Sequence, residues 1–153
     1  MIDVAVLVDS LRTRGETVAF AESLTGGLVC ATVVAVPGAS DVVRGAIVAY
    51  AGDLKVTLLG VDEQTLVRDG TVAASTAQAM ASGVAGRLGA TYGLATTGVA
   101  GPDPSEGKAP GTVHVAVAGP GDLRHRELHL TGDRQSVREG AVHAVLELLA
   151  ERL

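Results

Sequence analysis

Residues 21–27 read Ala21-Glu22-Ser23-Leu24-Thr25-Gly26-Gly27, and this segment places two hydroxyls and two glycines where a strand turns into a helix. Residues 17–20 before it are predicted as a short buried strand, and the apolar run 28–36 after it is typical of a packed helix. A hydroxyl at such a junction lies near free backbone N–H groups, which bind phosphate or a developing oxyanion. The alternative is that Ser23 or Thr25 only caps the helix.

Length and composition predict one domain over residues 1–153. Of the 153 residues, 47% are hydrophobic, so the chain can bury a core without covalent cross-links. The single cysteine, Cys30, excludes an internal disulfide and is expected to be a buried structural thiol. The first residues lack the pattern of a signal peptide, and no apolar run is long enough to span a membrane. We therefore expect a cytoplasmic protein with no membrane partner.

Charge and aromatic content argue against a nucleic-acid partner. The net charge is −5, and the only aromatic residues are Phe20, Tyr50 and Tyr92. Nucleic-acid binders usually carry a basic face and aromatic platforms on which bases stack. Because both are missing, a small-molecule ligand fits the sequence better.

The rest of the chain alternates helices with strands and has one hairpin near its end. Helices are expected at 4–11, 28–36, 53–59, 62–68, 75–88 and from 133 almost to 153, and strands at 17–21, 45–50, 92–96, 112–118 and 123–130. Asp53 and Asp62 are expected to cap the two short helices, and Gly60 and Gly70 to end them. This order predicts a three-layer α/β/α sandwich with a mixed, mostly parallel sheet containing one antiparallel strand.

A functional site is expected at the carboxyl ends of the strands, where ligands gather in such sheets. Ser23, Tyr50 and the segment that begins at Thr97 all follow predicted strands. The loop 98–111 is long for a compact domain, and loops of that length are more often functional than accidental. These segments are therefore expected to meet at one edge of the sheet.

No metal or cofactor site is expected. His125 and His129 are four residues apart on a predicted strand, so their side chains would lie some distance apart on one face, and no third ligand is nearby. The glycine-rich stretches match neither the P-loop nor the dinucleotide-binding pattern.

Five motifs together resemble the CinA C-terminal family. In the order and approximate spacing of that family, the sequence contains Glu22-Ser23-Leu24-Thr25-Gly26-Gly27, Val48-Ala49-Tyr50 followed by Lys55 and Leu59-Gly60-Val61, Thr97-Gly98-Val99-Ala100-Gly101-Pro102-Asp103, Gly111-Thr112-Val113 and Gly132-Asp133-Arg134. Proteins of this family are nicotinamide-nucleotide amidohydrolases of pyridine nucleotide salvage, which convert nicotinamide mononucleotide (NMN) to nicotinate mononucleotide and ammonia. The resemblance covers nearly the whole chain and implies a stand-alone form, without the molybdopterin-binding-like domain of the longer CinA proteins.

The resemblance implies a catalytic set of Ser23, Tyr50 and Lys55, without a metal. A serine hydroxyl attacks an amide only when a nearby base accepts its proton, and a lysine serves as that base if burial disfavours its charged form. Tyr50 would either relay a proton to the leaving ammonia or orient Lys55.

The implied substrate carries a phosphate and a cationic pyridinium, so the site needs backbone donors and an acidic group. The residues expected to bind it are Glu22, Thr25, Gly26, Gly27, Thr97, Gly98, Ala100, Gly101 and Arg134. Arg134 would clamp the phosphate, and Glu22 or Asp103 would face the pyridinium. The alternative for Arg134 is a surface arginine beside Asp133.

Two departures from the family pattern keep other functions open. Ala73 stands where a serine is common, and Asp103-Pro104-Ser105 replaces a more glycine-rich tip. One alternative is a catalytically silent nucleotide-binding or oligomerisation module, and another is an amidohydrolase for a different small carboxamide. A homo-oligomer, most simply a dimer, is also expected.

Overall fold

The computed structural model describes residues 1–153 and contains a five-stranded sheet. The strands are β1 (Val18–Glu22), β2 (Val43–Val48), β3 (Tyr92–Gly98), β4 (Thr112–Gly119) and β5 (Asp122–His129). Their order across the sheet is β2-β1-β3-β4-β5, and β1 is parallel to both β2 and β3. Because β4 is antiparallel to both β3 and β5, it alone runs against the other four strands. The predicted mixed sheet with one antiparallel strand is confirmed.

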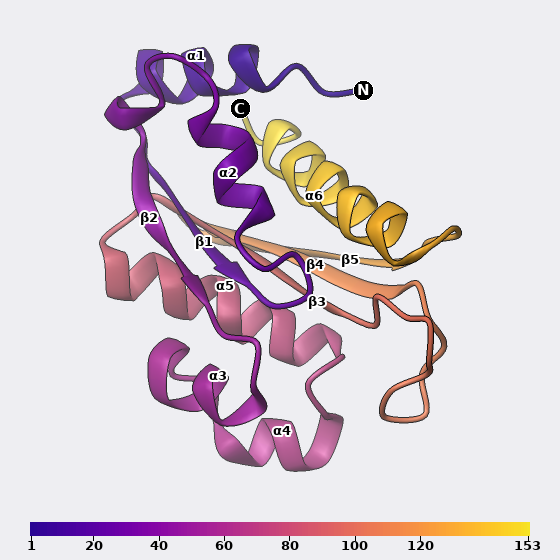
Figure 1. The fold of residues 1–153 in the computed structure, drawn as a ribbon. Helices are drawn as coiled ribbons and strands as arrows, with labels where there is room; N and C mark the ends of the chain where they lie inside the picture. The colour runs from indigo at the N-terminus through magenta and orange to yellow at the C-terminus, as the bar shows by residue number, and fades with distance from the viewer.

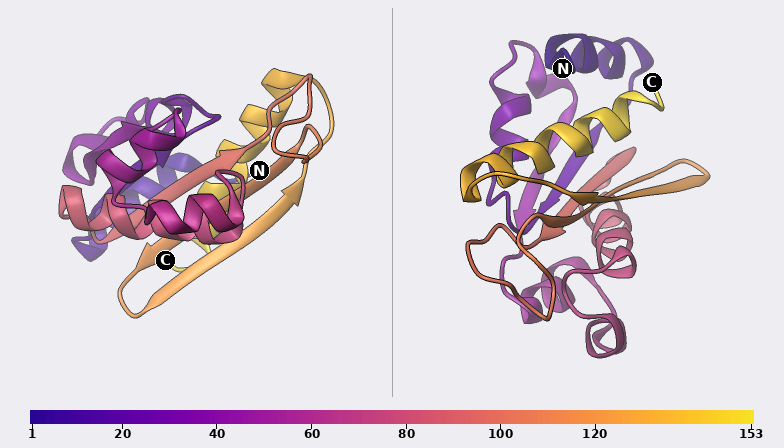
Figure 2. Two further views of the ribbon diagram at one scale, coloured as in Figure 1. Left: turned by 90° about the horizontal axis from the view of Figure 1, so that it is seen from below. Right: turned by 90° about the vertical axis from the view of Figure 1, so that its right-hand side faces the viewer.

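Helices cover both faces of the sheet. They are α1 (Val4–Arg14), α2 (Leu28–Val34), α3 (Gly52–Leu59), α4 (Glu63–Asp69), α5 (Ala74–Leu88) and α6 (Arg134–Ala150), with a short 3₁₀ turn at Ala39–Asp41. Figures 1 and 2 show α1, α2 and α6 on one side of the sheet and α3, α4 and α5 on the other. The predicted three-layer sandwich is therefore confirmed. None of these helices is both long and apolar enough to cross a membrane.

The expected ends of the short helices are mostly correct. Gly60 and Gly70 follow the last residues of α3 and α4, and Asp62 caps α4 by accepting a hydrogen bond from the N–H of Gln64. The prediction that Asp53 caps α3 is wrong, because the helix already begins at Gly52 and its N-cap is Ala51. Asp53 lies in the first turn instead, where its negative charge interacts favourably with the positive end of the helix dipole.

Side chains alternate between two cores along the strands, as the pleat of a sheet requires. Phe20 and Leu94 belong to the core beneath α1, α2 and α6, whereas Ala21 and Ala95 belong to the core beneath α5. The small side chains of Ala21 and Ala95 allow α5 to pack closely on this face of the sheet, and a side chain on Gly93 would clash with the backbone of α5. The helix α5 is therefore held tightly against the start of β3.

Cys30 is half-buried at the margin of the larger core, so the prediction of a buried thiol is only partly correct. Burial raises the pKa of this thiol, and the negative charge of Glu22 raises it further. A raised pKa disfavours the reactive thiolate.

Candidate active site

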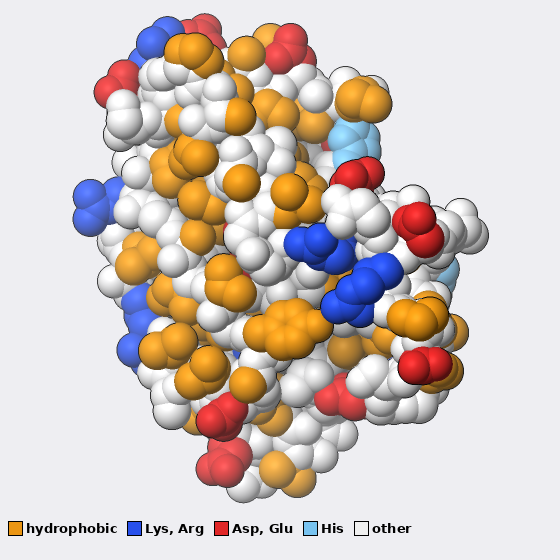
Figure 3. Space-filling view, in the orientation of Figure 1, with side chains coloured by type: hydrophobic (Ala, Val, Ile, Leu, Met, Phe, Trp, Pro, Cys, Tyr) orange, Lys and Arg blue, Asp and Glu red, His pale blue; other side chains and the backbone are white.

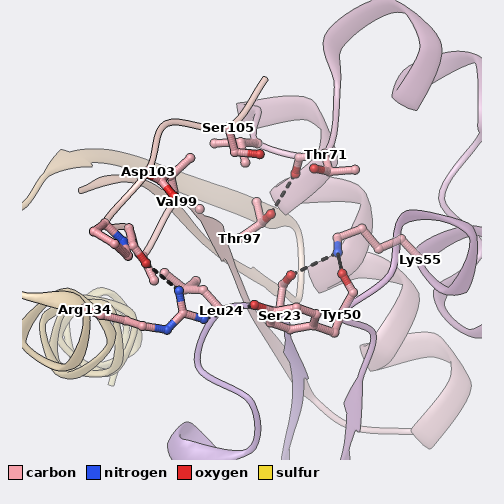
Figure 4. Close-up of a pocket in the computed structure, with 15 residues that line it drawn as sticks. Ser23, Leu24, Tyr50, Lys55, Thr71, Thr97, Val99, Asp103, Ser105 and Arg134 are labelled. Atoms are coloured by element: carbon pink, nitrogen blue, oxygen red, sulfur yellow. Dashed lines mark hydrogen bonds between the residues drawn. The ribbon is translucent and has the colours of Figure 1, made fainter. Parts of the chain in front are cut away.

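Ser23 lies at the point where β1 ends, in a cavity of about 430 Å³ at the carboxyl ends of the parallel strands (Figure 4). Its N–H donates to the carbonyl of Thr96 on β3, and its carbonyl accepts from the N–H of Gly26. The side chain is only 8% exposed. Ser23 is thus fixed on rigid backbone while its hydroxyl faces the cavity.

Lys55 enters the same cavity from α3, and its side chain is almost completely buried, with 1% exposed. Its Nζ donates to Ser23 Oγ at 3.0 Å and to the carbonyls of Ala49 and Tyr50 at 2.7 and 3.3 Å. Burial lowers the pKa of Lys55 from 10.5 to about 8, although the negative charge of Glu106 opposes this shift. In its neutral form the amine retains two N–H donors for the carbonyls and presents its lone pair to Ser23.

Tyr50 follows β2, and the residue is 61% exposed at the mouth of the cavity. Its hydroxyl accepts a hydrogen bond from Arg134 and makes none with Ser23 or Lys55. Its backbone carbonyl, by contrast, accepts from Lys55. The structure therefore brings Tyr50 to the cavity, where its carbonyl rather than its hydroxyl orients the lysine.

Arg134 is the first residue of α6 and spans the cavity mouth. Its Nη1 donates to the carbonyl of Gly101 at 2.6 Å, and its Nη2 donates to Tyr50 Oη at 3.2 Å. Figure 3 shows a cluster of basic side chains on this face of the molecule. The guanidinium is exposed at the opening, where an anionic group of a ligand can reach it.

The 98–111 loop forms one wall of the cavity. Gly98, Ala100, Gly101 and Asp103 line this wall, and the backbone N–H groups of Ala100 and Gly101 donate to no group of the protein. The hydroxyl of Thr97, also in the lining, donates to the carbonyl of Thr71 at 2.7 Å. The wall therefore offers two free donors and one carboxylate to a ligand.

Four other predicted binding residues do not line the cavity: Glu22, Thr25, Gly26 and Gly27. The carboxylate of Glu22 is fully buried and accepts hydrogen bonds from the N–H groups of Gly27, Val29 and Cys30 at 3.2, 2.8 and 3.0 Å. It thereby satisfies the N-terminus of α2, which leaves no room there for a ligand's phosphate.

The alternative in which Ser23 or Thr25 caps α2 is wrong. The N-cap is Gly27, which has no side chain to offer, and Glu22 provides the cap from β1. Thr25 Oγ1 instead lies 2.8 Å from Thr96 Oγ1 in the interior. The Ser23 hydroxyl is therefore not used to begin the helix.

Several residues at the site were not singled out from the sequence. Thr71 and Val72, between α4 and α5, line the cavity beside the loop. Arg138 on α6 donates to the carbonyls of Leu24 and Thr25 at 2.9 and 3.0 Å and so braces the turn after Ser23. No local pattern marks these residues, because each acts through a contact with a distant part of the chain.

Two of the four histidines, His114 and His125, form a pair away from this cavity. His125 Nε2 lies 2.9 Å from His114 Nδ1, and the two rings stack. No group of three His, Cys, Asp or Glu side chains is arranged to hold a metal ion.

The chain is similar over nearly its whole length to known proteins. The CinA C-terminal domain family matches residues 3–153. A CinA-like protein of Frankia casuarinae is 51% identical over 148 residues, which are 97% of this chain and 34% of that protein. A putative competence-damage inducible protein of Desulforamulus reducens is 46% identical over 94% of this chain and 35% of its own length. The chain thus spans about a third of the length of these curated relatives.

Solved structures of similar proteins have the same fold. A CinA superfamily protein from Escherichia coli has a TM-score of 0.95 at 29% identity, covering 98% of this chain and 88% of that one. A competence/damage inducible protein from Agrobacterium tumefaciens has a TM-score of 0.90 at 35% identity, covering 99% and 96% of the two chains.

Proposed function

This chain belongs to the CinA C-terminal domain family, and we propose that it hydrolyses the carboxamide of NMN to nicotinate mononucleotide and ammonia. The observation that carries the proposal is the contact between Ser23 Oγ and the buried amine of Lys55, 3.0 Å apart in a cavity. A hydroxyl beside a lysine with a lowered pKa is a nucleophile with its base.

In the first step, neutral Lys55 accepts the proton of Ser23 while Oγ forms a bond to the carboxamide carbon. The carbonyl oxygen of the substrate becomes an oxyanion. The backbone N–H groups of Leu24 and Ala100 face no acceptor in the protein, and both residues line the cavity, so we assign them as the donors that stabilise this charge.

Collapse of this intermediate breaks the carbon–nitrogen bond. The ammonium of Lys55 returns its proton to the leaving nitrogen, which departs as ammonia and leaves an ester on Ser23. A water molecule then attacks the ester carbon while Lys55 accepts one of its protons. When the Ser23 oxygen leaves, Lys55 passes this proton to it, which restores the free hydroxyl, and the acid product ionises to the carboxylate. The carbonyls of Ala49 and Tyr50 hold the amine in place through both steps.

The cavity suits a charged mononucleotide. Its volume of about 430 Å³ is within the usual range for small-ligand sites. We assign the phosphate to Arg134 at the mouth, with the free N–H of Gly101 beside it, and the pyridinium to the carboxylate of Asp103. Both assignments use residues at the 98–111 loop wall.

Ammonia release from NMN, compared with release from nicotinamide and from glutamine, tests this function. Release from NMN alone is the expected result. Release from another carboxamide but not from NMN indicates a different amidohydrolase, and binding of NMN without release indicates a silent nucleotide-binding module.

We also propose that the chain forms a homodimer. The edge strand β2, the helix α3 and the connection between them expose Val48, Tyr50, Leu54 and Leu58. Figure 3 shows hydrophobic side chains on this face of the molecule, and an apolar sheet edge favours association. Sedimentation equilibrium at micromolar concentration should give twice the monomer mass, and a monomer mass there would rule the dimer out.

A further inference from the structure

The tip of the 98–111 loop is a tight two-residue turn with Glu106 at its corner. Ser105 and Lys108 exchange backbone hydrogen bonds of 3.1 and 2.8 Å, which leaves Glu106 and Gly107 between them. Glu106 has a φ of +51° and is the only residue other than glycine with a positive φ. Glutamate rarely adopts this left-handed conformation, so the rest of the structure must hold it there.

The Glu106 carboxylate is held by donors from the connection between α4 and α5. It accepts from Thr71 Oγ1 at 2.6 Å, from Thr71 N at 3.1 Å and from Val72 N at 3.2 Å. A side chain on Gly70 would meet Glu106 Oε2 at 2.6 Å, so a glycine is needed for this approach. Burial alone would raise the pKa of Glu106, but the hydrogen bonds from Thr71 and Val72 and the charge of Lys108 keep it below its usual value.

This contact connects two walls of the candidate active site. Thr71 and Val72 line the cavity beside the loop, whereas Glu106 itself is absent from the lining. The carbonyl of Thr71 accepts from Thr97, and that of Val72 accepts from Lys108. The same backbone segment therefore holds the loop tip, through Glu106 and Lys108, and the end of β3 just before the loop, through Thr97.

We infer that Glu106 is a positioning residue, which fixes the 98–111 loop to Thr71 and Val72 and so sets the place of the loop wall that receives the substrate. The inference rests on the proposed function for its substrate. Because the carboxylate does not reach the cavity, it acts on substrate binding through the position of Ala100, Gly101 and Asp103. Its negative charge also raises the pKa of Lys55, so binding affinity is the readout that isolates the positioning effect.

Amide hydrogen exchange tests the contact without any assay of activity. In Glu106→Ala, exchange at Thr71 and Val72 should become faster, because their N–H groups lose their acceptor. The melting temperature should change little, since the turn is exposed. Glu151→Gln is the matched control, because Glu151 is an exposed acid at the far end of α6 that pairs with Arg126. Unchanged exchange in Glu106→Ala would overturn the inference.

Affinity tests the consequence for the substrate. In a Ser23→Ala background, which prevents turnover, adding Glu106→Ala should weaken NMN binding roughly tenfold, since a displaced wall loses oriented contacts. In the same background, Glu106→Gln should give an NMN affinity between those of Ser23→Ala alone and Ser23→Ala with Glu106→Ala, because its amide oxygen can still accept one of the hydrogen bonds. Equal affinity with and without Glu106, despite faster exchange, would show a purely structural role and overturn the inference. Absence of ammonia release by the wild type, with binding still dependent on Glu106, would instead overturn only the proposed reaction.

Discussion

Arg134 Nη2 donates a hydrogen bond to Tyr50 Oη at 3.2 Å across the mouth of the cavity. The two residues are 84 positions apart in sequence: Tyr50 lies between β2 and α3, and Arg134 begins α6. A second bond, from Arg134 Nη1 to the carbonyl of Gly101, ties the guanidinium to the loop. The arginine is thus preorganised in an exposed position, with its planar group already oriented toward a ligand that enters.

Arg134→Ala should raise KM for NMN by about ten- to a hundredfold and change kcat less, because the charge binds a phosphate remote from the reacting carbon. Steady-state kinetics with NMN and with nicotinamide riboside, which lacks the phosphate, provide the measurement. For the riboside, the same substitution should change KM little. An equal rise in KM for both substrates would contradict the assignment of the phosphate to Arg134.

Tyr50→Phe is the control for this experiment, because it removes only the hydroxyl that Arg134 contacts. A few-fold rise in KM is expected, since the carbonyl that holds Lys55 is retained. A fall in kcat by two orders of magnitude would instead mean that the hydroxyl takes part in proton transfer.

Ser23→Ala should lower kcat by several orders of magnitude and leave the melting temperature nearly unchanged, because it removes the nucleophile and no packing contact. Lys55→Ala should lower kcat almost as much, and the double variant should be little worse than either single one, since the two act as a unit. Ammonia release and thermal unfolding of the three variants provide the test. Turnover by Ser23→Ala at a near wild-type rate would rule out the mechanism.

The rate should depend on pH through Lys55. Below its pKa of about 8 the amine is protonated and cannot accept the Ser23 proton, so kcat/KM should rise with pH and level off above pH 8. A pH profile between 5.5 and 9.5 measures the midpoint, and about a tenfold rise per pH unit is expected on the acidic side. A flat profile, or a midpoint near pH 6, would exclude Lys55 as the base.

Ala73→Ser should stabilise the protein without changing its activity. Ala73 is the N-cap of α5 and has no side chain to accept a hydrogen bond from the first turn, and it lies outside the cavity lining. A serine cap typically contributes about 1 kcal/mol, which corresponds to a rise in Tm of roughly 2–4 °C for a chain of this size. Ala74→Ser, one position inside the helix, is the control and should not raise Tm. A lower Tm for Ala73→Ser would show that the site has no room for the hydroxyl.

The order of the elements could be read from the sequence because it depends on local patterns. The apolar spacing in α1 and α6 and the glycines after α3 and α4 act over a few residues, and each was correctly placed. The residues that cap the helices were harder to predict from the sequence. Asp53 and Ser23 both have side chains suited to an N-cap, but the backbone places the helix starts elsewhere, and a buried acid from a neighbouring strand caps α2.

The sequence by itself determined the helix and strand order, and it predicted a site at the carboxyl ends of the strands and, through the resemblance, the catalytic set of Ser23, Tyr50 and Lys55, which the structure brings to one cavity. Only the tertiary structure decided what these side chains contact. Glu22 faces a helix terminus instead of the cavity, Tyr50 directs its hydroxyl to Arg134, and Glu106 reaches Thr71 across 35 positions. The lowered pKa of Lys55 also appears only on folding, because the loss of water around an ammonium depends on which distant segments surround it, and local sequence does not encode them.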